Sequence, residues 1–254
     1  MRTARHVLLC ATVVPVIAAG CAAPSSSPVA PTVYTAAPAA APVVVLDPGH
    51  NGGNARNLAE INRQVPDGRG GTKACNTTGT ATDAGYTEHA FTFDVAGRVA
   101  QRLTAAGVRV VMTRNDDRGV GPCVDERGKA GEREGAAAVV SIHADGAAPG
   151  GHGFHIALSD PPLNPAQEGP SHQLGVALRD AMRGGGFADS TYIGRDGLSP
   201  RPDLAGLNFS TRPAALIECA NMRNPDEARL VSSPEGRDRY AAAIATGILT
   251  FLGH

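Results

Sequence analysis

Three apolar segments of this chain each lead directly into a side chain that could bind a metal or carry a proton. The segments and the side chains that follow them are VVVLD (43–47) with His50, AAVVSI (137–142) with His143, and AALI (214–217) with Glu218. Short, nearly continuous apolar runs are typical of buried parallel strands. Open α/β sheets bind ligands at the carboxyl ends of their strands, so the sequence predicts that these side chains share one site.

Strands and helices alternate along the rest of the chain. Apolar residues spaced by four from Phe91 to Leu103 predict a helix that begins near Thr87 and ends at Gly107. The other expected elements are strands at 108–113 and 153–158, a charged helix at 125–134, a helix capped by Ser171, and a last helix starting at Ser233-Pro234-Glu235. We find no internal repeat. The pattern predicts an α/β fold: a single-domain sandwich with a mostly parallel central sheet flanked by helices.

The N-terminal segment has the features of an export signal. Arg2 and Arg5 precede an apolar run too short for an ordinary spanning helix, which predicts a signal peptide at 1–20. The run ends in Ala-Ala-Gly-Cys21, which resembles the lipobox of bacterial lipoproteins, so Cys21 is a candidate for lipidation, with plain secretion as the alternative. Residues 21–42, rich in Ala, Pro and Ser, predict a tether before a catalytic domain at 43–254. We therefore expect an exported protein of the cell envelope, membrane-anchored or secreted.

Charge and cysteine content narrow the possible classes further. Without Arg2 and Arg5 the chain has 21 basic against 24 acidic side chains, which gives no polybasic surface for a nucleic acid. Because export permits disulfides, and because Cys75 and Cys123 both lie in polar, Gly-rich loop sequence, we expect a bridge between them. Cys219 follows a buried strand and is expected to be a buried free thiol.

The candidate ligands match the requirements of a catalytic zinc ion, which takes three imidazole or carboxylate ligands. His50 and His143 follow strands, and Glu88 opens the helix after a polar insert at 51–85. His89 competes with Glu88, although the first helical turn can aim only one of the two at a metal. Glu60 is an alternative carboxylate in a segment whose sequence sets no clear frame for a ligand.

Glu218 ends an apolar strand, where an acid is costly unless it is paired or functional. A buried salt bridge is one explanation. The other is a general base that takes a proton from water and returns it to a leaving amine. Its position alone does not decide between the two.

Five motifs together resemble the zinc-dependent N-acetylmuramoyl-L-alanine amidases of the amidase_3 family. The motifs are LDPGHNG, TEHAFTFDVAGRVAQRL, RVVMTR, VVSIHAD and PAALIECANMRN. The resemblance runs in order from Val43 to Leu252 and is strongest to single-domain mycobacterial-type members. It implies that His50, Glu88 and His143 bind zinc and that Glu218 is the catalytic acid or base.

The resemblance also implies the reaction, which is hydrolysis of the amide between N-acetylmuramic acid and L-alanine. The expected substrates are peptidoglycan or muropeptide fragments in cell-wall turnover, remodelling or autolysis, and we expect a monomer. Cys219 and Met222 replace residues that are small or apolar in many relatives. Two alternatives remain: a zinc carboxypeptidase acting on stem peptides, and a non-catalytic muropeptide-binding lipoprotein. The first would be expected to carry a close His-x-x-Glu pair, which is missing at His50, and the second would lack the base.

Overall fold

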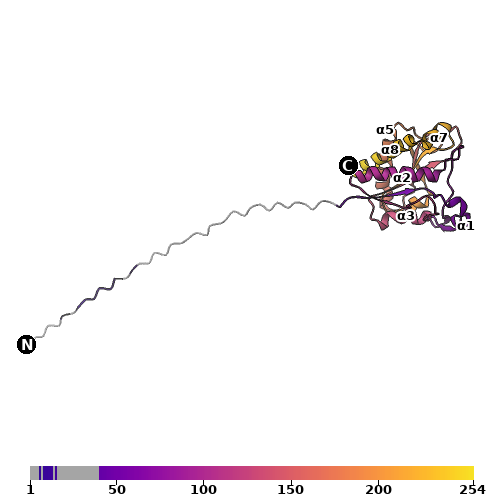
Figure 1. Ribbon diagram of the computed structural model, residues 1–254. Coiled ribbons are helices and arrows are strands. Elements are labelled where there is room, and N and C mark those ends of the chain that lie inside the picture. The colour runs from indigo at the N-terminus through magenta and orange to yellow at the C-terminus, as the bar shows by residue number, and fades with distance from the viewer. Residues whose placement is uncertain (1–5, 7, 14, 16–39) are drawn as a thin grey trace, which may run out of the picture. The chain divides into compact units, whose positions relative to one another are not determined.

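A six-stranded β-sheet organises residues 40–254 of the computed structural model (Figure 1). The structure describes residues 6, 8–13, 15 and 40–254. Cys21 and most of the predicted signal peptide and tether lie outside the described residues. Within the described part of the chain, no helix has the length and apolar character needed to cross a bilayer.

The strand order in the sheet is β4-β1-β5-β8-β6-β7. The strands are β1 (Val43–Pro48), β4 (Arg109–Met112), β5 (Ala138–Asp145), β6 (His155–Ser159), β7 (Leu198–Arg201) and β8 (Ala214–Asn221). Strands β4, β1, β5 and β8 are parallel, β6 runs antiparallel to β8, and β7 is parallel to β6. This confirms the predicted α/β fold with a mostly parallel sheet.

Helices cover both faces of the sheet. They are η1 (Asn54–Arg56), α1 (Leu58–Ile61), α2 (Glu88–Ala105), α3 (Val124–Arg133), α4 (Pro165–Glu168), α5 (Pro170–Gly184), α6 (Ala205–Asn208), α7 (Pro225–Ser232) and α8 (Pro234–Leu252). Figure 1 shows α2, α5 and α8 on one side and α3 on the other. The larger core lies beneath α2, α5 and α8, and a smaller cluster lies beneath α3 and α6.

The alternation of side chains along the central strands decides which residues can form a site. In β5, Val140 and Ile142 belong to the larger core, so Ser141 and His143 face the α3 side. In β8, Ile217 belongs to the larger core and Leu216 to the smaller cluster. Glu218 therefore emerges on the same face as His143, its partner in the β5–β8 register.

Two helices form as their sequences predict. The apolar stripe of α2, from Phe91 to Leu103, is completely buried, and the chain leaves the helix through Gly107 at φ 82°. A positive φ of this size favours glycine because it has no Cβ. Ser233 caps α8, accepting a hydrogen bond from the backbone N–H of Gly236 at 3.0 Å.

Other local expectations need correction. Ser171 does not cap α5: Pro170 and Gly169 begin that helix, and the Ser171 hydroxyl accepts a hydrogen bond from the backbone N–H of Ala214. Helix α7 and strand β7 were not predicted. Proline at the first position of α7 has a fixed φ suited to a helix start, and the Asn224 side chain caps it.

The insert at 51–85 is more ordered than its polar composition indicates. It contains η1, α1 and a hairpin of β2 (Gln64–Pro66) and β3 (Thr72–Ala74). The predicted disulfide between Cys75 and Cys123 is present, and it joins the end of the hairpin to the start of α3. Arg69 donates hydrogen bonds to Ser159 and to the backbone carbonyls of Pro161 and Pro202. These contacts fix the insert along the α3 side of the sheet.

Candidate metal centre and active site

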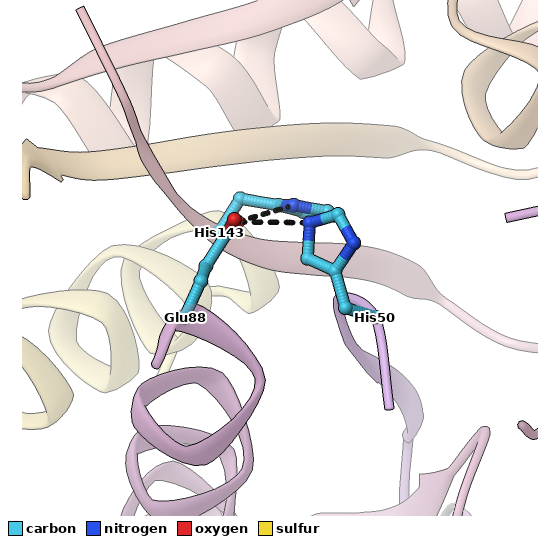
Figure 2. A group of neighbouring side chains, drawn as sticks. All are labelled: His50, Glu88 and His143. Carbon is cyan, nitrogen blue, oxygen red and sulfur yellow. Dashed lines mark hydrogen bonds and ion pairs between the residues drawn. The ribbon is translucent and has the colours of Figure 1, made fainter. Parts of the chain in front are cut away.

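The side chains of His50, Glu88 and His143 converge at the carboxyl ends of β1 and β5, and one ligand atom from each lies within 4.8 Å of the others. Figure 2 shows both imidazole rings turned toward one carboxylate oxygen of Glu88. Oε1 of Glu88 lies 3.1 Å from Nε2 of His50 and 3.0 Å from Nδ1 of His143. Two imidazoles and one carboxylate at these distances are an arrangement that could hold a metal ion.

Each ligand comes from a different element. His143 projects from β5, and Glu88 is the first residue of α2, so its carboxylate lies at the positive end of the helix. His50 follows β1 in a left-handed conformation, with φ 57°, which is uncommon for a residue with a Cβ. This conformation returns the ring toward the sheet.

Backbone groups orient two of the ligands. Nδ1 of His50 lies 3.0 Å from the carbonyl oxygen of Thr77, so Nδ1 carries a proton and Nε2 is the nitrogen that faces the centre. The backbone N–H groups of Thr80 and Ala144 donate to the Glu88 carboxylate. Sequence analysis did not identify Thr77 or Thr80. They contribute through their backbone, and the turn-forming segment TTGT carries no residue-specific signal for that role.

The charges at the centre favour a cation. Burial alone would raise the pKa of Glu88, but the adjacent His50 and His143 outweigh it and hold the pKa well below its usual value. Burial would lower the pKa of His50, and the Glu88 carboxylate overrides this and raises it. Glu88 therefore remains anionic between the two imidazoles, as a metal-binding carboxylate must be.

Glu218 lies on β8 beside the three ligands. It is opposite His143 in one neighbouring strand and opposite His155 in the other. Its Oε2 atom is buried and has no hydrogen-bond partner among the residues that the structure describes. Burial, followed by the negative charges of Glu88 and Asp145, raises the pKa of Glu218 well above its ordinary value. No ion pair involving Glu218 occurs among the described residues, so the alternative of a buried salt bridge is not supported.

One cleft joins the ligands and Glu218. Its volume is about 510 Å³, and it extends from the three ligands along the α3 face of the sheet. The lining continues from Asp145 and Ser141 to apolar side chains of β8 and α6, among them Leu216 and Leu207. Lys73 of the hairpin and Val124 of α3 form part of its walls. A substrate can therefore reach the ligands and Glu218 together.

The competing ligands lie elsewhere. His89 points away from the cluster and pairs with Asp117, with Nδ1 2.7 Å from Oδ2. Glu60 is exposed on α1 and does not belong to the group of three ligands. Cys219 is the predicted buried free thiol and belongs to the larger core on the opposite face of the sheet, so it does not line the cleft.

Comparison with known proteins agrees with this site. The family model of N-acetylmuramoyl-L-alanine amidases, Amidase_3, matches residues 44–250. The chain is 48% identical over 210 residues to the N-acetylmuramoyl-L-alanine amidase Rv3717 of Mycobacterium tuberculosis, covering 83% of this chain and 86% of the relative. It is similar to the crystal structure of Ami1 from Mycobacterium smegmatis, with a TM-score of 0.82 and 54% identity over 84% of this chain and 98% of that one.

A crystal structure of Ami1 from Mycobacterium abscessus gives a TM-score of 0.81 at 50% identity, covering 84% of this chain and 99% of that one. The family match decides for an amidase against the carboxypeptidase and the non-catalytic binding protein. The disulfide agrees with a cell-wall enzyme that works outside the cytoplasm. The chain belongs to the amidase_3 family and is an N-acetylmuramoyl-L-alanine amidase that hydrolyses peptidoglycan.

Proposed function

We propose that His50, Glu88 and His143 bind one zinc ion and that Glu218 moves the proton during hydrolysis of the amide between N-acetylmuramic acid and L-alanine. The observation that carries the proposal is that one cleft contains the three converging side chains and a carboxylate whose buried oxygen has no partner in the described part of the chain. A structural acid would be expected to have a partner for that oxygen.

The donor set fits zinc. Two imidazole nitrogens and one carboxylate oxygen are ligands that catalytic zinc sites use, and such sites leave a further position open. The hydrogen bond from Nδ1 of His50 to the Thr77 carbonyl is the usual means of fixing a ligand's tautomer. When bound, zinc supplies Lewis-acid activation of the scissile carbonyl and of the attacking water.

Glu218 carries the proton between water and the leaving group. In its ionised form it accepts a proton as the water oxygen bonds to the lactyl carbonyl carbon. It then delivers that proton to the alanine nitrogen as the C–N bond breaks, which leaves a lactyl carboxylic acid and a free amine. The lactyl acid passes the second water proton to the amine, so the final products are a lactyl carboxylate and an alanine ammonium group. The raised pKa of Glu218 suits both roles, because the carboxyl holds the proton well and the carboxylate accepts it readily.

The cellular setting is part of the proposal. We infer that residues 1–20 direct export, that 21–42 tether a catalytic domain at 43–254, and that Cys21 is lipidated. The substrates are peptidoglycan or muropeptide fragments, bound in the cleft by a monomeric enzyme. The apolar walls formed by Leu207 and Leu216 provide contacts for the uncharged parts of such a substrate.

Two variants separate a metal ligand from a proton carrier. Glu88→Ala should lose zinc and activity together, since two imidazoles alone bind zinc poorly. Glu218→Gln keeps the shape and should keep the metal while losing about 10²- to 10⁴-fold in rate. Elemental analysis after gel filtration measures zinc, and mass spectrometry of muropeptides measures the release of alanine amines. A metal-free Glu218→Gln protein, or one within a few-fold of the wild-type rate, would contradict these roles.

A further inference from the structure

Two buried arginines surround the turn that carries His50. Arg127, on α3, is 4% exposed. Its Nη1 donates to the carbonyl oxygen of Pro48 at 2.8 Å and its Nη2 to that of His50 at 3.0 Å. The same guanidinium pairs with Asp47 at 2.8 Å, so it holds both the end of β1 and the metal-ligand residue itself.

Arg114 follows the end of β4, approaches the same turn and is 5% exposed. Its Nε donates to the carbonyl oxygen of Pro48 at 3.0 Å and its Nη2 to that of Gly49 at 3.2 Å. The Nη2 atom also donates to the carbonyl oxygen of His89 at 2.9 Å, in the first turn of α2 and next to Glu88. Arg114 therefore connects the segments that carry two of the three ligands.

All three carbonyl oxygens of the turn, at positions 48, 49 and 50, accept hydrogen bonds from a guanidinium. Charge-assisted bonds to several acceptors in a fixed planar geometry hold a backbone more firmly than a single neutral bond. The turn needs such support because His50 is in the left-handed region, where a residue with a Cβ is disfavoured.

We propose that Arg114 and Arg127 are positioning residues of the metal centre, which set the placement of His50 against Glu88 before the ion binds. The inference rests on the proposed zinc site. Replacing a group that hydrogen-bonds to a metal ligand and orients it typically lowers the metal affinity by 10- to 100-fold. The Asp47–Arg127 ion pair alone would be enough to join α3 to β1. The additional hydrogen bonds from Arg127 to the carbonyls of the turn are therefore not needed for that connection.

The test is zinc affinity, measured by competition with a chromophoric chelator and independent of catalysis. Arg114→Lys and Arg127→Lys keep the charge, but a lysine ammonium cannot reach several carbonyls at once. Each substitution should therefore raise the zinc dissociation constant about 10- to 100-fold. Arg69→Lys is the matched control. Arg69 also joins separate segments through several acceptors, but these lie at 159–161 and 202–208. The Arg69→Lys protein should bind zinc within about two-fold of the wild-type affinity, even if all three lysine variants are less stable than wild type.

Thr92→Val provides a second route if a lysine variant does not fold. The Thr92 hydroxyl donates to the Gly49 carbonyl oxygen at 2.8 Å and lies 3.2 Å from Nη2 of Arg114. Valine keeps the volume and removes this link, so zinc affinity should fall about three- to ten-fold. Unchanged zinc affinity in every folded variant, or an equal loss in Arg69→Lys, would overturn the inference. A wild type that binds no zinc would overturn the proposed function, and this inference with it.

Discussion

Gly49 provides a direct test of how tightly the metal centre is packed. A Cβ added at this position would lie 2.2 Å from Cε1, 2.4 Å from Nε2 and 2.5 Å from Nδ1 of His143. Carbon atoms in contact prefer about 3.5 to 4.0 Å, so in Gly49→Ala the imidazole must retreat by roughly 1 Å. Gly49 is not among the glycines with a positive φ, so the substitution acts through the contact with His143 and not through backbone strain.

That displacement is large on the scale of metal coordination. Ligand distances in metal sites hold to about ±0.2 Å, so a shift of roughly 1 Å removes His143 from the ligand set. We expect zinc affinity to fall at least about 100-fold, which corresponds to about 2.7 kcal/mol. The metal-free protein should lose about 1 to 3 kcal/mol through overpacking, less than the full stability of a domain this size.

The measurements are zinc stoichiometry after gel filtration, the zinc dissociation constant by chelator competition, and urea unfolding of the metal-free protein. Gly97→Ala is the control, because a Cβ at that position in α2 meets no atom of the described residues within 4 Å. It should keep full zinc affinity and gain up to about 1 kcal/mol of stability from better helix propensity. Gly49→Ala protein that binds zinc as tightly as wild type would refute the reasoning, because His143 would then not need its present position.

Three further predictions concern the disulfide, the anchor and pH. Replacing both Cys75 and Cys123 by Ser opens a loop with a sequence separation of 48 and should cost about 4 kcal/mol in urea unfolding; an unchanged midpoint would contradict this. Cys21→Ser should release the enzyme from membrane fractions, whereas wild type found only in the soluble fraction would rule out lipidation. Burial lowers the pKa of His155 to about 4 from 6.5. The unfolded chain therefore binds this proton first, and stability should fall by about 3 kcal/mol as the pH drops from 7 to 4, but not in His155→Gln. Urea midpoints that fall equally in both proteins would exclude His155 as the cause.

Local sequence patterns predicted the elements whose burial is periodic. The spacing of four from Phe91 to Leu103 requires a helix to bury these side chains on one face, and α2 buries them completely. Strands β1, β5 and β8 were predictable for a similar reason, because continuous apolar runs are buried only in a sheet that is covered on both faces.

The same patterns failed where distant residues complete a local structure. Ser171 has the chemistry of a helix cap, yet its hydroxyl serves the backbone of Ala214, 43 residues further along the chain. The insert has little apolar periodicity of its own. It is held by the Cys75–Cys123 disulfide and by hydrogen bonds from Arg69 to loops near 160 and 202. Contacts between residues this far apart in the sequence produce no periodic pattern in either segment, so they cannot be predicted from local sequence.

The sequence by itself determined which side chains could form the centre and which end of the sheet would hold it. His50, His143 and Glu218 each follow an apolar run, and the carboxyl ends of parallel strands lie at the same edge of a sheet. The pairing of β5 with β8, which places His143 opposite Glu218, is known only from the structure. Only the tertiary structure decided how the ligands are aimed. The Thr77 carbonyl selects the tautomer of His50, and Arg114 and Arg127 hold its backbone. These bonds join segments between 27 and 77 residues apart, and their directions exist only once the chain has packed.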